Sequence, residues 1–318
     1  MDLSQINDVI KVAQNIVVAG HVNGDGDSIG ACLAMAFCLE KIGKSPTVYL
    51  GNIAEKYSIL PGFNFVHKGN ISDIPTPDLF ISLDCGEDSR LGEDILPLFK
   101  KTKSIVIDHH VNLGFGDYNY IVPTASSTCE ILYDIIVSLC EMDRNIAQCL
   151  YAGLVTDTGG FRLSNTNTKT FEVASHLVKE DIPFSQICEK LMYELTLKQF
   201  NGFISIVSKF VYVSDINLVY VIATKEEMDK LQITRTDLDG VSNMLRRISE
   251  LEISIFAYET DNNKVKISLR SRSININKVA KALGGGGHIN ASGVVLDMPV
   301  NEAVEKVINK IRELGDVI

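Results

Sequence analysis

The chain has 318 residues, a length that suits about two domains, and its 46% hydrophobic and 22% charged residues are ordinary for a globular protein. Its formal net charge of -10 argues against general electrostatic binding of long nucleic acid, because such binding needs a basic surface. The longest apolar run, residues 29–39, is far shorter than the roughly 20 residues of a membrane span.

Cysteine usage and the first residues indicate the compartment. The seven cysteines form no CxxC pair and lie mostly in apolar runs, so we expect buried free thiols in a reducing compartment. The opening MDLSQINDVIKVAQ lacks the basic and apolar regions of a signal peptide. We therefore expect a cytoplasmic protein that does not contact a membrane.

The first half of the chain alternates predicted strands and helices. A buried strand is expected over residues 15–21 and a helix over residues 27–43, and the runs SPTVYLG, DLFISLDCG and KSIVIDHH are expected as short strands. Strands separated by helices imply an α/β domain, with a parallel sheet and flanking helices. Ligands of such sheets bind beyond the carboxyl ends of the strands.

Side chains that bind metals follow three of these predicted strands. His21 and Asp25 come after the first strand, Asp84 follows another, and Asp108, His109 and His110 follow a third. Two carboxylates also crowd into the glycine-rich bend HVNGDGDSIG, where like charges repel unless a cation or hydrogen-bond donors compensate. A purely structural turn formed by aspartate side chains is the alternative for that bend.

A further aspartate, Asp157, ends a helical run that starts near residue 145, where an acidic side chain opposes the helix dipole and favours a nearby cation. The candidate metal ligands are thus His21, Asp25, Asp27, Asp84, His109 and Asp157. Imidazole and carboxylate without thiolate suit Mn, Fe, Co or Zn, and the excess of carboxylate favours Mn or Mg. The set is large enough for two metal ions that share a bridging carboxylate.

The second half of the chain divides into a helical stretch and a smaller domain. Residues 169–210 have a helical pattern, whose later part we interpret as a linker, and strands and helices then follow up to the amphipathic segment VNEAVEKVINKIREL. We predict a metal-binding catalytic domain over residues 1–188, a helical linker over residues 189–213, and a smaller α+β domain for substrate binding over residues 214–318.

The glycine run GGGGH is a candidate phosphate-binding segment. Gly285, Gly286 and Gly287 have no Cβ to keep a phosphate from the backbone amides. His288 adds a further donor or a ring that stacks on a base. A plain glycine linker is the alternative interpretation.

Three arginines are candidates for binding the substrate. Arg270 and Arg272 lie at the end of a predicted strand and suit a forked contact with a terminal phosphate. Arg90, in the stretch DSRLG, is the third candidate. For each of the three, an ordinary solvent-exposed arginine is the alternative.

Six ordered motifs resemble those of the DHH phosphoesterase superfamily, which is named for the triplet at Asp108, His109 and His110. HVNGDGDSIG, SLDCGEDSRLG, VIDHHVN and GLVTDTGGFRLSNT are similar to its first four motifs, and SLRS and GGGGHINASG to the associated DHHA1 domain. Gly24 replaces the usual Pro and Ser292 the more usual Ala, but neither is a candidate ligand. Within the superfamily, the chain most resembles the bifunctional oligoribonucleases (nanoRNases) that also act as 3′-phosphoadenosine 5′-phosphate phosphatases.

The resemblance implies a site for two Mn²⁺ ions, with Mg²⁺ or Co²⁺ as alternatives. The implied ligands are His21 and Asp25 for one ion, Asp27, His109 and Asp157 for the other, and Asp84 as the bridge between them. His110 would stabilise the charge that develops on the phosphate, and Asp108 would orient the histidines.

The resemblance also implies a reaction. A Mn²⁺-dependent phosphodiesterase and phosphatase would cut oligoribonucleotides of about two to five nucleotides to mononucleotides, and 3′-phosphoadenosine 5′-phosphate to AMP. One alternative is a phosphodiesterase of a cyclic-dinucleotide pathway, which would cut linear dinucleotides such as pApA. The alternative without catalysis is a nucleotide-binding sensor. We expect neither long nucleic acid nor a membrane as partner, and a monomer or a homodimer.

Overall fold

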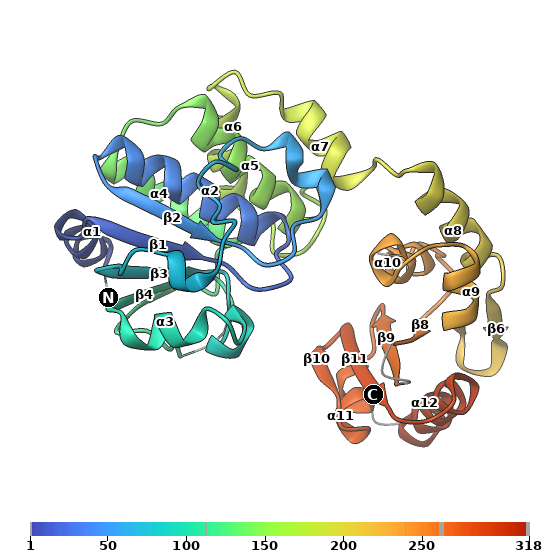
Figure 1. The fold of residues 1–318 in the computed structure, drawn as a ribbon. Coiled ribbons are helices and arrows are strands. Elements are labelled where there is room, and N and C mark those ends of the chain that lie inside the picture. Colours follow the sequence, from blue (N-terminus) through green and yellow to red (C-terminus); the bar gives the residue numbers. More distant parts are fainter. Residues whose placement is uncertain (1, 112, 239, 261–263, 316–318) are drawn as a thin grey trace. The chain divides into compact units, whose positions relative to one another are not determined.

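The computed structural model describes residues 2–111, 113–238, 240–260 and 264–315, and its strands form two separate sheets. The chain divides into two units, residues 1–194 and 195–318, and this boundary falls inside the stretch predicted as a linker (Figure 1). Asn112, the last residue of the motif VIDHHVN, lies outside the described residues. No helix in the described part of the chain is both long and apolar enough to span a membrane.

Five parallel strands form the sheet of the first unit, in the order β2-β1-β3-β4-β5. They are β1 (Asn15–Ala19), β2 (Ser45–Tyr49), β3 (Leu79–Leu83), β4 (Ser104–Asp108) and β5 (Tyr118–Ile121). Every residue of β3 and β4 is buried, as expected for a parallel sheet that is covered on both faces. The predicted α/β domain with a parallel sheet is therefore confirmed.

Helices cover both faces of this sheet. Successive residues of one strand enter different hydrophobic cores, since Ile81 belongs to the core formed with the large helical layer and Phe80 packs against Phe99 on the other face. Figure 1 shows the two layers. The helices are α1 (Leu3–Val12), α2 (Gly26–Lys41), α3 (Leu96–Lys101), α4 (Thr128–Leu139), α5 (Arg144–Asp157), α6 (Thr168–Val178) and α7 (Phe184–Met192), with short 3₁₀ helices η1 (Glu55–Ile59), η2 (Ile71–Asp73) and η3 (Asp88–Leu91).

Two glycines bring α2, α4 and α5 unusually close together. A Cβ at Gly30 of α2 would lie 2.3 Å from the carbonyl oxygen of Cys149 in α5. A Cβ at Gly153 of α5 would lie 2.3 Å from the Cys129 Sγ and 2.6 Å from the Asp27 Oδ1. These contacts are too short for a real side chain, so the missing Cβ atoms set the helix spacing around Asp27.

Six strands form the mixed sheet of the second unit, in the order β10-β11-β9-β8-β7-β6, and only β7 and β8 pair in parallel among the described strands. They are β6 (Val211–Val213), β7 (Leu218–Ala223), β8 (Ile253–Glu259), β9 (Val265–Ser271), β10 (Gly286–His288) and β11 (Ala291–Leu296). The helices are α8 (Leu197–Val207), α9 (Lys225–Lys230), α10 (Val241–Leu245), α11 (Asn277–Ala282) and α12 (Val300–Leu314), with η4 (Ser214–Ile216) and η5 (Arg235–Leu238).

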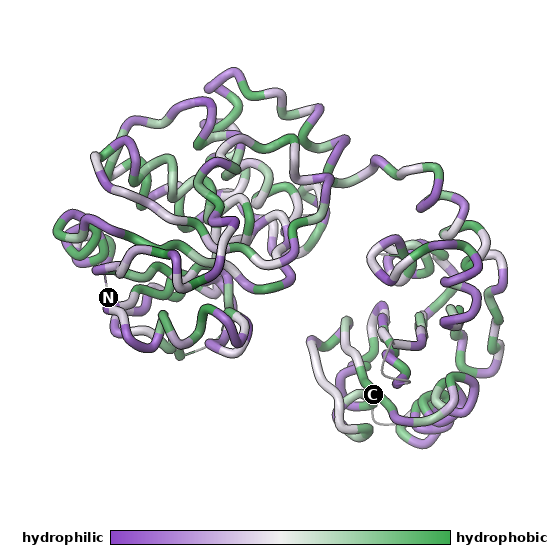
Figure 2. The backbone as a smooth tube through the Cα atoms, in the orientation of Figure 1, coloured by the Kyte–Doolittle hydropathy of each residue, from purple (hydrophilic) through white to green (hydrophobic). Residues whose placement is uncertain are grey.

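Hydrophobic patterning explains how the helices of the second unit attach to its sheet. Val300, Val304, Val307 and Ile311 are buried at spacings of three and four residues, so one face of α12 packs on the sheet, and Figure 2 shows the polar and apolar residues alternating along this helix. α8 also packs within this unit, because Ile206 is completely buried in the core on the opposite face of the sheet. The predicted smaller α+β domain is confirmed.

Candidate metal centre

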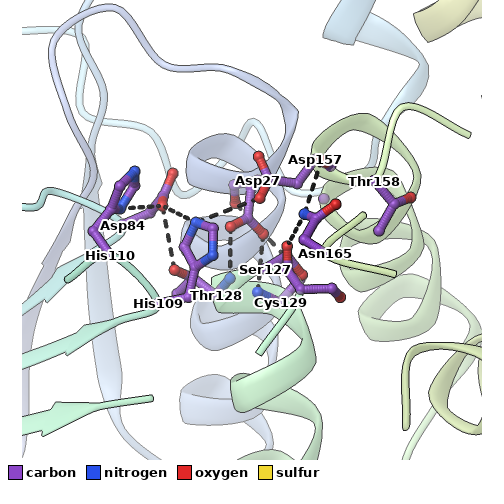
Figure 3. Close-up of polar contacts among 12 residues, drawn as sticks. Asp27, Asp84, His109, His110, Ser127, Thr128, Cys129, Asp157, Thr158 and Asn165 are labelled. Carbon is purple, nitrogen blue, oxygen red and sulfur yellow. Dashed lines mark hydrogen bonds and ion pairs between the residues drawn. The ribbon is translucent and has the colours of Figure 1, made fainter. Parts of the chain in front are cut away.

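The candidate metal centre forms where several elements of the first unit end. β1 ends two residues before His21, β3 ends one residue before Asp84, and β4 ends with Asp108. Since these three strands are parallel neighbours, their carboxyl ends meet at one edge of the sheet. α5 ends with Asp157 at the same place, and α2 begins there (Figure 3).

The predicted ligands gather in three overlapping groups, and in each group the ligand atoms lie within 4.8 Å of one another. The groups are His21, Asp25 and Asp84; Asp27, His109 and Asp157; and Asp84, Asp108, His109 and His110. The structure therefore brings all six candidate metal ligands together, although they are spread over more than 130 residues of sequence.

Asp84 lies between the first two groups. Its Oδ2 is 3.8 Å from the His21 Nε2, whereas its Oδ1 is 3.6 Å from the His109 Nε2. The two oxygens thus face different groups, which is what a bridging carboxylate requires. Asp84 has a φ of 60°, a left-handed conformation that costs roughly 1–2 kcal/mol for an L residue, although aspartate tolerates it better than most.

Asp27 is held by the beginning of α4. Its Oδ2 accepts a hydrogen bond from the Thr128 N–H at 2.6 Å, and its Oδ1 accepts one from the Cys129 N–H at 2.9 Å (Figure 3). Ser127 caps this helix by accepting the Glu130 N–H. Because the N-terminus of a helix carries partial positive charge, it stabilises the completely buried carboxylate.

Asp25 serves two purposes with its two oxygens. Its Oδ1 caps α2 by accepting the N–H groups of Asp27 and Ser28, both at 3.1 Å. Its Oδ2 lies 3.8 Å from the His21 Nε2 and faces the ligand group. Asp25 therefore forms the structural turn through one oxygen and leaves the other facing the candidate ligand group.

The surroundings of His21 show whether its site suits a cation. The Nε2 of His21 is buried and has no hydrogen-bond partner among the described residues, yet it lies 3.8 Å from a carboxylate oxygen on either side. A buried polar atom without a partner costs stability unless a ligand satisfies it. A divalent cation bound by imidazole and carboxylate would satisfy the nitrogen and both oxygens at once.

The carboxylates also disfavour one another's ionisation. Burial and the charges of Asp27 and Asp25 raise the pKa of Asp84 well above its ordinary value. Burial and the same two neighbours raise the pKa of Asp157 to about 9. A bound cation would reverse this effect, so the donor set fits a divalent metal ion with oxygen and nitrogen ligands.

Asp108 orients His110. Its Oδ1 accepts hydrogen bonds from the His110 Nδ1 at 2.8 Å and from the His110 backbone N–H at 3.0 Å, and its Oδ2 accepts the Gly86 N–H at 2.6 Å. Burial opposes the ionisation of Asp108, but these hydrogen bonds outweigh it and hold the pKa of the carboxyl below its ordinary value. The His110 ring is fixed edge-on to the ring of His109, with centroids 4.5 Å apart.

Arg90 lies beside this histidine. A Cβ built on Gly86 would be 3.5 Å from the Arg90 Nη1 and 3.9 Å from the His110 Cβ, so the guanidinium and the imidazole flank the same glycine. The Arg90 carbonyl accepts the Val22 N–H at 2.9 Å, which ties η3 to the loop after β1. The structure thus brings Arg90 close to His110.

The two candidate arginines of the second unit differ in what they contact. Arg270 lines a cavity of about 260 Å³ together with Arg235, Asn243 and Tyr258. Arg272 instead donates hydrogen bonds to the carbonyl oxygens of three residues that follow or end α10, namely Arg246, Ile248 and Leu251. The structure therefore places Arg270 in a cavity and gives Arg272 a structural role.

The glycine run also serves packing. A Cβ at Gly285 would lie 2.2 Å from the Gly293 carbonyl oxygen, and one at Gly287 would lie 2.6 Å from the Ala291 carbonyl oxygen. Gly286 has no atom within 4 Å of a built Cβ, and His288 is exposed. Gly287 and His288 are exposed and Gly285 and Gly286 are half-buried, and a side chain at Gly285 or Gly287 would also disturb the pairing of β10 with β11.

Several residues at these sites were not predicted. Thr128 and Cys129 hold Asp27, and Asn165 donates hydrogen bonds to the carbonyl oxygens of Ser126 and Asp157. A signal for the first two existed, because a helix start at Ser127 offers free N–H groups to an anion. No local pattern pointed to Arg235, Asn243 and Tyr258, which meet only in the folded second unit.

Family models match both units. The model described as the N-terminal domain of the DHH family matches residues 15–154, and the model described as the DHHA1 domain matches residues 215–314. The chain therefore belongs to the DHH family of phosphoesterases, which are hydrolases, and carries a DHHA1 domain. The resemblance of the sequence motifs is confirmed.

Individual relatives cover nearly the whole chain. A protein of Thermus thermophilus named bifunctional oligoribonuclease and PAP phosphatase NrnA is 25% identical over 97% of this chain and 93% of its own length. The Bacillus subtilis protein of the same name is 27% identical over 89% of this chain and 90% of its own length. The crystal structure of an exopolyphosphatase-related protein from Bacteroides fragilis matches with a TM-score of 0.90 at 25% identity, covering 98% of this chain and 96% of that chain.

One further relative has a different name. The cyclic-di-AMP phosphodiesterase GdpP of Bacillus subtilis is 26% identical over 97% of this chain, which corresponds to only 49% of that longer protein.

Proposed function

We propose that the chain is a phosphodiesterase and phosphatase that uses two divalent metal ions, preferably Mn²⁺, to cut oligoribonucleotides of about two to five nucleotides and to convert 3′-phosphoadenosine 5′-phosphate to AMP. The observation that carries this proposal is the position of Asp84, whose two oxygens face separate ligand groups at 3.6 and 3.8 Å. The substrates follow from the names of the relatives from Thermus thermophilus and Bacillus subtilis.

The ligands divide into two sets that share Asp84. His21 and Asp25 would hold one ion, and Asp27, His109 and Asp157 would hold the other. When bound, two such ions supply a water of lowered pKa as nucleophile and neutralise charge on the phosphoryl group. Asp27 needs no rearrangement for this role, because α4 already fixes its carboxylate through two backbone N–H groups.

His110 and Arg90 would act on the phosphoryl group itself. Asp108 fixes the Nδ1 of His110, so the opposite edge of the ring, with Nε2, is the one that would donate to a phosphoryl oxygen. Arg90 adds positive charge near the same glycine, Gly86. Both groups would stabilise charge that increases as the bond to the ribose oxygen breaks.

The second unit would bind the end of the substrate. Arg270 lies in a cavity with a second arginine, Arg235, whose guanidinium lies 5.8 Å above the ring of Tyr258. Two guanidinium groups suit a terminal phosphate, and the Asn243 amide would add a hydrogen-bond donor and an acceptor. Gly285, Gly286, Gly287 and His288 are further candidates for contact with this phosphate, because none of them is buried.

A linear dinucleotide such as pApA is the second candidate substrate. The observation that favours it is the similarity of the whole chain to one half of GdpP, whose name specifies a cyclic dinucleotide of adenosine. A linear dinucleotide has the same terminal phosphate and the same scissile diester as a short oligoribonucleotide. The metal centre would therefore treat both in the same way.

Parallel assays test the proposal. Protein stripped with EDTA is given Mn²⁺, Mg²⁺ or Co²⁺ and is assayed on pApA, a five-nucleotide RNA and 3′-phosphoadenosine 5′-phosphate. We expect release of mononucleotides and AMP, and a loss in Asp84→Asn of more than about 100-fold, the upper range for mutating partners of metal ligands. Asp8→Asn, an exposed position on α1, serves as the control.

The outcomes separate the alternatives. Activity that survives in Asp84→Asn would contradict the two-metal centre. A wild-type preference for pApA over the other two substrates would favour the dinucleotide pathway. Turnover that needs no added metal after stripping would contradict the role of the whole ligand cluster.

A further inference from the structure

Two thiols lie side by side at the far ends of α2 and α4. Cys38 belongs to the last turns of α2, and Cys140 is the residue that caps the end of α4. Their Sγ atoms are 3.5 Å apart, although the two residues are separated by 102 positions in the sequence. Cys38 is completely buried, whereas Cys140 is half-buried and can be reached from solvent.

The same two helices are joined at their other ends by Asp27. This residue contacts Cys129 in the first turn of α4. Asp27 lies eleven residues before Cys38, and Cys129 lies eleven residues before Cys140. Eleven residues of helix span about 16 Å. The helices therefore run in parallel, with one polar contact at the start of the pair and the two thiols at its end.

The surroundings of Cys140 favour its thiolate. The hydrogen bond with Cys38 and the positive charge of Lys41 lower the pKa of the Cys140 thiol, against the effect of burial. Lys41 is held close by an ion pair of 2.9 Å with Asp143 and a hydrogen bond of 2.8 Å to the Glu141 carbonyl oxygen. The thiolate is the reactive form of cysteine, so Cys140 is the more nucleophilic member of the pair.

The other cysteines differ from Cys140 in these respects. Burial raises the pKa of each of the thiols of Cys32, Cys85, Cys129, Cys149 and Cys188. Cys188 is half-buried like Cys140. Among the described residues, however, no other thiol lies in hydrogen-bond contact with it. Cys188 therefore serves as the matched control, a thiol of similar exposure that has no partner thiol.

We propose that Cys38 and Cys140 are a redox-active dithiol, which a hydroperoxide converts to an intramolecular disulfide. The Cys140 thiolate attacks one peroxide oxygen, the O–O bond breaks, and the leaving oxygen departs as water or alcohol while Cys140 becomes a sulfenic acid. The Cys38 sulfur then attacks the Cys140 sulfur, the S–O bond breaks, and the oxygen leaves as water with the Cys38 proton. Two thiols are oxidised by two electrons, and one peroxide is reduced.

The disulfide would join the helix pair that positions Asp27. A bond of about 2.05 Å requires the sulfurs to approach from 3.5 Å, which is a small movement of two side chains at helix ends. A cross-link that closes a loop of this length restricts the unfolded chain strongly, so the oxidised protein is more resistant to heat. In a reducing compartment such a bond is transient and is reversed by thiol reductants.

Peptide mapping of the full-length protein treated with hydrogen peroxide tests the proposal. We expect a mass loss of about 2 Da, from the two hydrogens that disulfide formation removes, a cross-linked peptide pair containing Cys38 and Cys140, and a raised melting temperature that returns to its starting value with dithiothreitol. Cys188→Ser should leave all three results unchanged. Cys38→Ser should abolish the cross-link and leave Cys140 trapped as a sulfenic acid that reacts with dimedone.

A second variant keeps the test valid if Cys38→Ser, at a buried position, does not fold. Cys140→Ser changes a half-buried residue at a helix end, and it should abolish both the cross-link and the dimedone adduct. The proposal is overturned if peroxide adds oxygen without forming the Cys38–Cys140 pair, if another pair forms instead, or if wild type and Cys140→Ser respond alike. These readouts do not depend on enzymatic activity.

Discussion

The Oδ1 atom of Asp27, in the first turn of α2, accepts the backbone N–H of Cys129, in the first turn of α4, at 2.9 Å. This bond crosses from one helix to another and fixes a candidate metal ligand through the backbone rather than through a flexible side chain. Gly153 of α5 lies against both partners, because its missing Cβ would be 2.6 Å from the Asp27 Oδ1 and 2.3 Å from the Cys129 Sγ. Three helices therefore share one crowded contact next to the metal centre.

Gly153→Ala should damage stability and metal binding together. The added methyl group overlaps Asp27 and Cys129, and overpacking of this kind costs about 1–3 kcal/mol. That cost equals or exceeds the gain of about 1 kcal/mol that alanine brings to a helix interior. Denaturant unfolding and calorimetric titration with Mn²⁺ measure the two effects. Gly286→Ala, where a Cβ meets nothing within 4 Å, should keep its stability.

The metal-free protein should lose stability as the pH rises. The pKa of Asp157 is raised from 3.8 to about 9 in the folded state, so the folded protein retains a proton that the unfolded chain has lost. The stabilisation from this group is complete below the unfolded pKa and is lost progressively up to about pH 9. Melting temperatures in EDTA should fall between about pH 5 and 9, and saturating Mn²⁺ should remove much of that fall.

Asp157→Asn provides the control for this pH dependence. An amide does not ionise, so the fall in melting temperature over the same pH interval should be smaller in the variant than in the wild type. A metal-free wild type whose melting temperature stays constant across the interval would contradict the prediction.

Asp108→Asn should lower kcat more than it changes KM. The amide keeps an acceptor oxygen but loses the charge that fixes the His110 ring, and partners of this kind contribute about 10–100-fold to activity. Steady-state kinetics on a short oligoribonucleotide separate the two constants. Asp88→Asn, at a half-buried aspartate that pairs with Lys100, is the matched control. An unchanged kcat in Asp108→Asn would argue that His110 needs no orientation.

Arg270 and Arg272 should give opposite results when each is changed to alanine. Arg270→Ala removes a guanidinium from the cavity, so KM for 3′-phosphoadenosine 5′-phosphate should rise at least about tenfold, since charge-assisted hydrogen bonds contribute about 1.5–3 kcal/mol. Arg272→Ala leaves three carbonyl oxygens without their donor and should lower stability by about 1–3 kcal/mol with KM nearly unchanged. A raised KM in Arg272→Ala with an unchanged KM in Arg270→Ala would indicate that Arg272, and not Arg270, binds the phosphate.

Local patterns predicted the elements of the first unit well but not their ends. The strand expected over residues 15–21 ends at Ala19, because the chain leaves the sheet at Gly20, where a Cβ would lie 2.1 Å from the Ser28 Oγ. The helix expected over residues 27–43 spans Gly26–Lys41, and Gly43 follows it with a φ of 77°. The candidate ligands were recognisable because parallel strands bring their carboxyl ends together.

Contacts between distant residues were beyond local patterns. Asp27 and Thr128 are 101 positions apart, and nothing in either segment specifies the hydrogen bond between them. Arg272 reaches three carbonyl oxygens that lie more than 20 positions before it, so its structural role depends on the folded second unit. The glycine run was interpreted by its phosphate chemistry, whereas Gly285 and Gly287 are also required by the pairing of β10 with β11.

The order of the strands has a consequence for how the enzyme can diverge. His21 and Asp84 follow β1 and β3, and Asp108 ends β4. These three strands are adjacent in the sheet and therefore about 4.8 Å apart. Backbone hydrogen bonds fix that interval between neighbouring strands. Substitutions in the second unit can thus change substrate range across homologues, while the backbone of the sheet keeps the starting points of these three side chains at a fixed interval.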